Sequence, residues 1–298
     1  MRTYVSARGA KREATISNWS EIKLLTRDLL DACKSGAPIR DSWTQFRTLV
    51  RANEERPPAH LVQMLDLLES ISKPRGEIAI LDHGCGGGKT ALYLLALGYT
   101  GISGVDVGGN CEALNRLLAE ECSIADKRFY VYDGLRLPFA DASMDFVLSQ
   151  QVLEHVPDDV VDAYYREEGR VMRAGAIAYH EVPHRLMPYD SHMRSFFVHL
   201  APRRMAARLY RALGRNVEFF EHHLFLRWPW VHARLARRYI GPIDDLTLGR
   251  LRRTPVSDDY EGNLLLRRGG DVLVRLPIVG AALSLLAMRT TITTKAHR

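Results

Sequence analysis

A glycine-rich loop constrains the fold of this chain more than any other feature. The loop covers residues 82–88, reads DHGCGGG, follows an apolar strand pattern and precedes a helix pattern that opens at Lys89. Glycines at alternate positions allow a sharp turn and a close backbone approach to a ligand, and the helix N-terminus offers free N–H groups. The loop therefore predicts a nucleotide-type ligand at a strand-to-helix turn of an α/β fold.

Two other glycine-loop motifs fit this segment less well. A phosphate-binding loop ends in the same Gly88-Lys89-Thr90 pattern, but it needs a glycine where His83 stands. The dinucleotide fingerprint G-x-G-x-x-G starts at Gly84 and is broken at Lys89. The loop alone therefore leaves the identity of the ligand open.

Three acidic residues end three successive strand patterns and narrow the choice. Asp82 ends the first, Asp106 ends the second at 102–106, and Asp133 ends the third at 129–133. An acid at the end of the second strand can hold both ribose hydroxyls of a nucleotide. Asp133 is placed to accept a hydrogen bond from an adenine amino group. Each acid alone is typical of a turn or a helix cap, but the three together beside the glycine loop favour a nucleoside-binding site.

The order of the remaining patterns predicts the sheet. Strand patterns lie at 78–82, 102–106, 129–133, 146–149 and 176–181, and helix patterns at 89–97, 111–122 and 158–171 separate most of them. This β-α-β-α-β-β-α-β order predicts a doubly wound, mostly parallel sheet with helices on its faces. Two further strands are expected near 246–248 and 291–294.

Four segments are expected along the 298 residues. Residues 1–75 form a helical N-terminal extension, with helix patterns at 20–33 and 42–73, the second broken at Pro57 and Pro58. Residues 76–182 form the ligand-binding core. An insertion rich in Arg, His and aromatic residues, 183–230, is predicted to act as a lid, and 231–298 supply closing helices and the last strands.

Composition places the chain among folded soluble proteins. Apolar residues make up 46% and charged residues 26%, and no uncharged run reaches the roughly 20 residues of a membrane-spanning helix. No apolar stretch follows the basic N-terminal residues, so a secretory signal is not predicted and the expected location is the cytoplasm. The four cysteines show neither a C-x-x-C pair nor zinc-ligand spacing, which predicts reduced thiols and no structural metal.

The positive charge is concentrated in one part of the chain. The net charge is +6, yet residues 194–253 hold 13 Arg and no Lys against four acids. Arg204, Arg208, Arg211 and Arg215 recur at helical spacing and predict a basic amphipathic helix. Such a helix suits an anionic substrate or the inner face of a membrane, although it is equally typical of a solvated surface. Nucleic acid is not expected as a partner, because no nucleic-acid-binding signature accompanies the arginines.

Four motifs taken in order resemble the class I S-adenosylmethionine-dependent methyltransferases. They are LDHGCGGG at 81–88, LPF at 137–139, DFVLS at 145–149 and LEHV at 153–156. The resemblance implies a Rossmann-like, seven-stranded sheet with a reversed last strand and S-adenosyl-L-methionine as cofactor. Asp82 and the glycines would border the methionine part, Asp106 the ribose and Asp133 the adenine. The full predicted cofactor-binding set is Asp82, Gly84, Cys85, Gly86, Gly88, Asp106, Val107, Asp133, Gly134 and Gln150.

Methyl transfer from a sulfonium needs chiefly positioning, but a hydroxyl acceptor also gains from a general base. The candidates for this base, taken as catalytic residues, are His192, His155 and His184, which follow the fourth and fifth strand patterns where open α/β sheets bind ligands. Residues 183–192 resemble a stretch of methyltransferases linked to glycan and glycolipid modification, in which Arg185 would bind an anionic group. A metal site from Asp190 with His180, His184 or His192 has no recognisable spacing, so no metal is predicted.

Three functions follow from the sequence, in order of preference. The first is O-methylation of a hydroxyl on a sugar, glycan or glycolipid by an S-adenosylmethionine-dependent methyltransferase. The second is C- or N-methylation of a small metabolite or a quinone. The third is a non-catalytic cofactor-binding domain that contacts a membrane or a partner through the Arg-rich insertion.

Overall fold

The computed structural model describes residues 17–55, 57–253 and 272–296, which fall into two compact units. The first unit holds the described residues up to Leu148 together with 171–176. The second holds 149–170 and the described residues from Ile177 onward.

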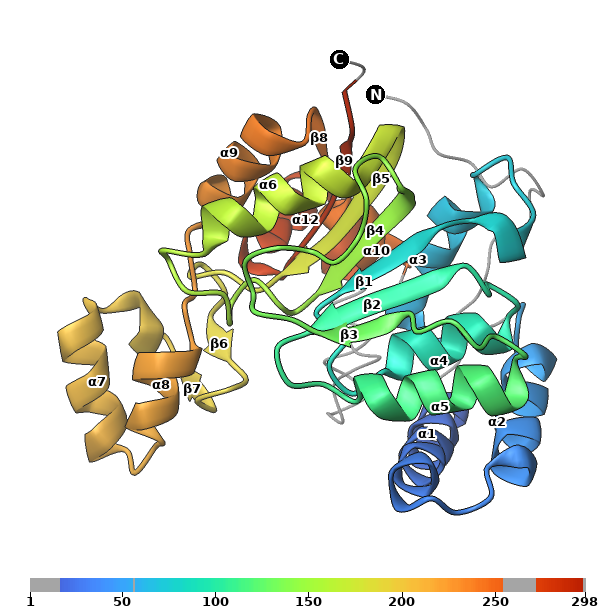
Figure 1. Ribbon diagram of the computed structural model, residues 1–298. Coiled ribbons are helices and arrows are strands. Elements are labelled where there is room, and N and C mark those ends of the chain that lie inside the picture. The colour runs from blue at the N-terminus through green and yellow to red at the C-terminus, as the bar shows by residue number, and fades with distance from the viewer. Residues whose placement is uncertain (1–16, 56, 254–271, 297–298) are drawn as a thin grey trace. The chain divides into compact units, whose positions relative to one another are not determined.

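The first unit places helices against the strands that carry the glycine loop (Figure 1). Its elements are α1 (Ser17–Ser35), α2 (Arg40–Ala52), α3 (Ala59–Glu69), a 3₁₀ turn (Arg75–Glu77), β1 (Ile80–His83), α4 (Lys89–Ala96), β2 (Ile102–Asp106), α5 (Cys111–Glu121), β3 (Phe129–Val131) and the start of β4 (Met144–Gln150). Helix α5 forms because Leu114, Leu117 and Leu118 recur on one face, and that face is buried against the unit. The break between α2 and α3 falls at Pro57 and Pro58, as predicted.

The second unit contains the residues that follow the fourth strand. Its elements are α6 (Val161–Val171), most of β5 (Met172–Val182), β6 (Tyr189–Asp190), β7 (Ser195–Phe196), a 3₁₀ turn (Val198–Leu200), α7 (Arg203–Ala212), α8 (Val217–His223), α9 (Pro229–Tyr239), β8 (Ile243–Asp245), α10 (Thr247–Arg253), α12 (Pro277–Leu286) and β9 (Arg289–Thr294). Tyr210 of α7 and Phe220 of α8 are buried in a small core of their own with Met193. This core makes the predicted insertion a folded structure.

The larger sheet has seven strands in the order β3-β2-β1-β4-β5-β9-β8. Strand β1 pairs in parallel with β2 and β4, β2 pairs in parallel with β3, and β9 runs antiparallel to both β5 and β8. The doubly wound, mostly parallel sheet and its reversed last strand are therefore confirmed. Because β1, β2 and β3 are parallel neighbours, the residues that follow them lie along one edge of the first unit's part of the sheet.

One predicted strand is wrong. Thr247 and Leu248 begin helix α10, Leu246 lies in neither element, and the strand of this region, β8, is at Ile243–Asp245. The side chain of Asp245 accepts a hydrogen bond from the backbone N–H of Thr247 at 2.8 Å, which is how an acidic residue caps a helix N-terminus. The cap outweighs the β-preference of the short Leu-Thr-Leu run.

Arg204, Arg208 and Arg211 lie on helix α7, as their spacing predicted, but the helix ends at Ala212, so Arg215 lies beyond it. In the part of the chain that the structure describes, no helix combines the length and the apolar character needed to cross a membrane. The division into four segments stays a prediction.

Candidate functional site

The glycine loop adopts a conformation that glycine alone tolerates well. Gly84, Gly86 and Gly88 have φ values of +91°, +46° and +75°. Gly88 also caps α4, and a Cβ atom there would lie 2.8 Å from the side chain of Leu114. The loop is anchored because the carbonyl of Val105 in β2 accepts hydrogen bonds at 2.9 Å from two successive loop N–H groups. The chain thus holds this backbone turn, of which Gly84 and Gly86 are half-buried and Gly87 is exposed, at a fixed place beside β2.

Asp106 ends β2 with its carboxylate held by backbone donors. Its Oδ2 accepts a hydrogen bond from the N–H of Gly86 at 2.8 Å, and its Oδ1 accepts one from Gly108 at 2.9 Å. A Cβ atom on Gly109 would lie 2.5 Å from the carbonyl oxygen of Gly86, so the close contact between residue 109 and the glycine loop requires glycine at 109. A carboxylate has about four lone-pair sites, and the two that remain are available to a ligand with paired hydroxyls.

Asp133 follows β3 and is similarly oriented by the backbone. Its Oδ1 accepts hydrogen bonds from the N–H groups of Leu135 at 2.8 Å and Arg136 at 3.1 Å, and these donors lower the pKa of its carboxyl. Beside it, a Cβ on Gly134 would lie 3.7 Å from the side chain of Val107, which is 70% exposed. The structure therefore brings Val107, Asp133 and Gly134 together as an exposed apolar and acidic edge.

The other predicted residues of the first unit lie deeper. Asp82 is buried, and burial with the nearby Asp106 carboxylate raises its pKa to about 7. His83 is also buried, and its Nε2 lies 2.8 Å from the hydroxyl of Tyr132. The Cys85 thiol is hydrogen-bonded to that of Cys111, and its pKa is raised by this bond and by burial. His83 and Cys85 therefore support the loop from beneath.

Two of the predicted residues are engaged within the second unit. The Gln150 side chain donates a hydrogen bond to Glu181 at 3.3 Å, and its cofactor role stays a prediction. His184 is buried, its Nε2 donates to the carbonyl of Ala287 at 2.8 Å, and its Nδ1 accepts from the N–H of Leu186 at 3.1 Å. Burial lowers the pKa of His184 to about 4. With both nitrogens engaged, His184 has none left to accept a proton from a substrate, and the structure gives it a supporting role instead.

His155 and His192, by contrast, lie together with a carboxylate. Glu154, His155 and His192, here called the Glu–His cluster, each offer one ligand atom, and these atoms lie within 4.8 Å of one another. The two imidazole rings meet edge to face with centroids 4.9 Å apart, and the Nε2 of His155 is 3.9 Å from Oε1 of Glu154. Phe219 of α8 stacks against His192 with ring centroids 6.0 Å apart.

Each histidine of the Glu–His cluster has an outer partner on its Nδ1 atom. His155 Nδ1 lies 2.6 Å from the carbonyl oxygen of His223, which can only accept, so this nitrogen carries the proton. His192 Nδ1 lies 3.5 Å from Oδ1 of buried Asp190. Asp190 raises the pKa of His192, whereas burial lowers the pKa of His155 and raises that of Glu154 to about 7.

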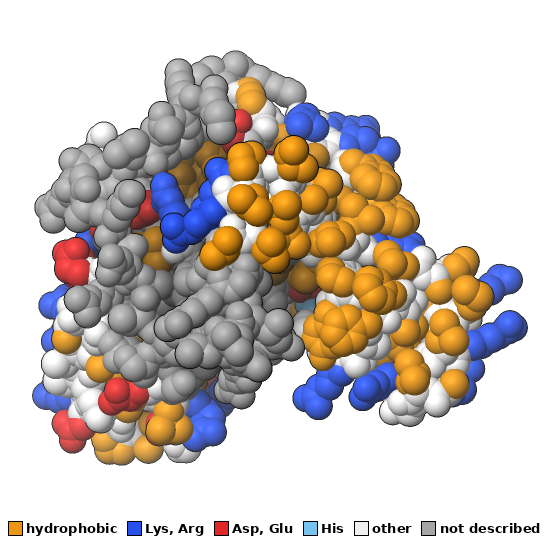
Figure 2. Space-filling view, turned by 180° about the vertical axis from the view of Figure 1, so that it is seen from behind, with side chains coloured by type: hydrophobic (Ala, Val, Ile, Leu, Met, Phe, Trp, Pro, Cys, Tyr) orange, Lys and Arg blue, Asp and Glu red, His pale blue; other side chains and the backbone are white. Residues whose placement is uncertain are grey.

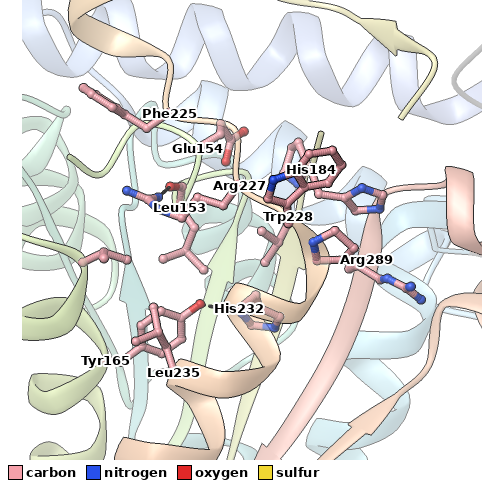
Figure 3. A pocket seen from close by; sticks show the side chains of 14 residues that line it. Leu153, Glu154, Tyr165, His184, Phe225, Arg227, Trp228, His232, Leu235 and Arg289 are labelled. Carbon is pink, nitrogen blue, oxygen red and sulfur yellow. Dashed lines mark hydrogen bonds between the residues drawn. The ribbon is translucent and has the colours of Figure 1, made fainter. Parts of the chain in front are cut away.

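Two cavities lie in the second unit. The one in Figure 3 has a volume of about 20 Å³, enough for a single water, and is lined by residues that include Glu154, His184 and Trp228. The other has a volume of about 160 Å³ and is lined by Arg185, Arg203 and Arg227, among others. Nη2 of Arg185 already donates to three backbone carbonyls, so this side chain shapes the cavity wall as well as lining it.

Sequence reasoning missed Glu154, and it considered Asp190 with His192 only as a metal pair without recognisable spacing. Glu154 stands inside the LEHV motif, where it is unremarkable, and His192 comes 38 residues later in the turn between β6 and β7. The turn is fixed by Asp190, whose Oδ1 accepts hydrogen bonds from the backbone N–H groups of His192 at 2.9 Å and Met193 at 3.4 Å. Only the folded chain brings these side chains together, so no local signal could have identified the set.

Similarity to known proteins is concentrated in the strands and helices that carry the glycine loop. Residues 81–179 match the family described as "Methyltransferase domain". The chain is 35% identical over 122 residues to the ubiquinone biosynthesis O-methyltransferase of Paramagnetospirillum magneticum, a match covering 40% of this chain and 47% of that protein. It is 32% identical over 105 residues to the ajmaline N-methyltransferase of Rauvolfia serpentina, covering 35% and 34%.

Solved structures with a similar fold include the geranyl diphosphate C-methyltransferase of Streptomyces coelicolor. That likeness has a TM-score of 0.46 and 13% identity, and it covers 85% of this chain and 82% of that one. The chain spans less than half the length of the two curated relatives described above. The two curated relatives are named as an O-methyltransferase and an N-methyltransferase, so their similarity to this chain leaves the acceptor atom open.

Proposed function

Since residues 81–179 form a class I S-adenosylmethionine-dependent methyltransferase domain, we propose that this chain transfers the methyl group of S-adenosylmethionine to a hydroxyl acceptor. The observation that carries the cofactor assignment is the joint placement of the glycine loop, Asp106 and Asp133 along one sheet edge. The glycine turn fits the methionine part, the carboxylate of Asp106 fits the ribose diol, and the Val107–Asp133 edge fits the adenine ring and its amino group. The cofactor supplies the reactive methyl, and the chain supplies binding and orientation.

Asp82 gives this site a pH dependence whose sign can be worked out. Its pKa is raised from 3.8 to about 7, so the ligand-free chain holds this carboxyl protonated below neutral pH. That protonation contributes stability which is complete below about pH 4 and is lost as pH rises through about 7. A bound cofactor brings a positive sulfonium and ammonium group beside the loop, which favours the ionised carboxylate.

We therefore expect the affinity for S-adenosylmethionine to rise with pH, by up to about tenfold per pH unit below the pKa of Asp82, and to level off above it. Calorimetry in two buffers of different ionisation enthalpy should record proton release on binding near pH 6. Asp82→Asn should remove this release and flatten the profile. An Asp82→Asn profile identical to that of the unmodified chain would assign the pH dependence to another group.

The acceptor atom is proposed from the Glu–His cluster. A hydroxyl does not lose its proton unaided at neutral pH, whereas a neutral amine or an activated carbon can be methylated by positioning alone. His155 and His192, which the sequence predicted as catalytic residues, lie together in one cluster with the carboxylate of Glu154. We assign assistance with the hydroxyl proton to this cluster, which favours O-methylation over the C- or N-methylation of a small metabolite or quinone.

A sugar, glycan or glycolipid hydroxyl is the acceptor we place first, and the surface of the second unit favours a lipid-linked one. On α7 the apolar Met205 and Leu209 are exposed, at 51% and 42%, beside the exposed arginines Arg204, Arg208 and Arg211. Helix α12 also exposes an apolar side chain, Ile278, at 86%. Figure 2 shows hydrophobic side chains gathered over one face with Lys and Arg at its edges. Exposed apolar residues flanked by cations are typical of peripheral contact with an anionic membrane.

Replacing Arg204, Arg208 and Arg211 with Gln tests this membrane contact. We expect association with vesicles containing phosphatidylglycerol to fall at least severalfold, and wild-type association to weaken as salt is added, because the attraction is electrostatic. The matched control replaces Arg27, Arg40 and Arg136, three exposed arginines of the first unit, with Gln. Equal vesicle binding by the two triple variants would mean that the α7 arginines are solvent-exposed side chains with no specific role in membrane contact.

Incubation with methyl-deuterated S-adenosylmethionine separates the three candidate functions. Purified chain is mixed with fractions of glycans, glycolipids, quinones and small metabolites, and the products are fragmented in a mass spectrometer. If the chain is an O-methyltransferase, the deuterated methyl group should be found on an oxygen atom of an acceptor molecule in one of the fractions. Label on nitrogen or carbon would support the second function. Cofactor binding with no labelled product in any fraction would support a non-catalytic domain that contacts a membrane or a partner.

A further inference from the structure

The carboxylate of Glu154 lacks the partner that its burial demands. Glu154 is 1% exposed, and within the described part of the chain neither of its oxygens accepts a hydrogen bond. Of its two histidine neighbours in the cluster, His155 has its Nε2 3.9 Å from Oε1 of Glu154, too far for a hydrogen bond. A buried carboxylate without a hydrogen bond or a paired charge is costly, so either a proton or a cation compensates for it.

The two histidines are oriented as metal-ligating histidines usually are. Nδ1 of His155 donates to the carbonyl of His223, which leaves Nε2, the nitrogen on the side of Glu154, with its lone pair. Nδ1 of the His192 ring lies 3.5 Å from Oδ1 of Asp190. The same oxygen also accepts a hydrogen bond from the backbone N–H of His192 at 2.9 Å. Ligating histidines characteristically give their other ring N–H to a backbone carbonyl or a carboxylate, because this fixes the tautomer and raises ligand basicity.

We propose that Glu154, His155 and His192 bind one divalent first-row transition-metal ion, of the Zn²⁺ and Co²⁺ type. The proposal rests on geometry: the three ligand atoms lie within 4.8 Å of one another, and one of them is an orphaned buried carboxylate. A four- to six-coordinate ion needs ligand separations of about 3 to 4 Å, so the site closes by about 1 Å on binding. Two imidazoles and one carboxylate favour Zn²⁺-like ions over Mg²⁺ and Ca²⁺, which prefer oxygen ligands.

Three protein ligands leave coordination positions open, as in catalytic metal sites. An ion there would lower the pKa of a hydroxyl that occupies an open position, which is how the cluster would assist the acceptor in the proposed function. This consequence rests on that function, whereas the presence of the ion does not. Metal binding can therefore be measured without cofactor or acceptor, and its failure would leave the methyl-transfer proposal standing.

The test is a titration of untagged, chelator-treated full-length chain with Zn²⁺ by calorimetry and with Co²⁺ by visible absorption. We expect one equivalent of each ion to bind and Co²⁺ to show the d–d bands of a nitrogen- and oxygen-ligated site. Glu154→Gln, which keeps size and removes charge, and His192→Ala should each weaken binding at least 100-fold. Asp190→Asn changes the outer partner of His192, together with the acceptor of the Met193 N–H and the Tyr210 hydroxyl, and leaves the three proposed ligands in place; it should weaken binding about 10- to 100-fold.

His222→Ala is the matched control, because His222 is exposed and neighbours the His223 carbonyl without belonging to the cluster. Thermal unfolding of each variant in chelator checks that the chain still folds. If Glu154→Gln and His192→Ala both keep the metal affinity of the unmodified chain, the ion binds at other residues and the proposal is wrong. An unmodified chain that binds neither ion would also overturn the proposal, and it would mean that Glu154 is compensated by a proton alone.

Discussion

Asp106→Ala should weaken the binding of S-adenosylmethionine and S-adenosylhomocysteine by about 10² to 10⁴-fold. The carboxylate ends β2 with two lone-pair sites directed away from the glycine loop's own N–H groups, where a ribose diol would donate two charge-assisted hydrogen bonds. Each such bond contributes about 1.5 to 3 kcal/mol, and every 1.4 kcal/mol is about a factor of ten in affinity. The substitution also releases Gly86, which loosens the loop itself. Equilibrium dialysis with labelled cofactor measures the change.

Asp126→Ala is the matched control for this variant, because Asp126 is an exposed acid of the same unit and its removal changes net charge equally. It should leave cofactor affinity within about twofold. A melting temperature for Asp106→Ala close to that of the unmodified chain would show that lost affinity reflects lost contacts. Undiminished affinity in a folded Asp106→Ala variant would remove this residue from the ribose site.

The second large effect is expected at His192. His192→Ala should reduce the rate of methyl transfer to a hydroxyl acceptor by about 10² to 10⁴-fold, because the acceptor proton then leaves without the help of the Glu–His cluster. The affinity for S-adenosylmethionine should be unchanged. Initial rates at saturating cofactor, together with the dissociation constant from dialysis, separate these two quantities.

His222→Ala is the control: His222 is exposed at the end of α8, next to His223, and its loss should leave the rate unchanged. Phe219→Leu gives an intermediate case, since it removes the ring that stacks on His192 while keeping an apolar residue there. An acceptor methylated equally fast by His192→Ala and by the unmodified chain would be contrary to our assignment. That result would favour nitrogen or carbon as the acceptor atom.

The fold and the cofactor loop were predictable because their signals are local. The glycines at 84, 86 and 88 take the left-handed conformations that their spacing predicted, and the acids at 82, 106 and 133 fall at or just after the ends of β1, β2 and β3. Strand and helix periodicity sufficed for the mostly parallel sheet. The short run at 246–248 was predicted as a strand because its apolar pattern carries no helix signal, and the cap from Asp245 was overlooked.

The histidines show where such reasoning ends. His155, His184 and His192 were equivalent in the sequence, since all follow strand patterns and all have the same unperturbed pKa. Burial and two hydrogen bonds separate His184 from the others, and those bonds come from Leu186 and from Ala287, which is far away in the chain. Glu154 becomes part of a candidate site only because the turn between β6 and β7 brings His192 next to it. Contacts between distant segments decide these roles, and no periodicity reports them.

Binding of the methyl donor by the glycine loop and the three acids can be measured directly. Calorimetric titration of the full-length chain with S-adenosylhomocysteine, the demethylated product, tests it without any knowledge of the acceptor. We predict a single saturable site and a rise in melting temperature that grows with ligand concentration, as for any ligand selective for the folded state. No heat of binding and no shift in melting temperature at millimolar S-adenosylhomocysteine would contradict this assignment.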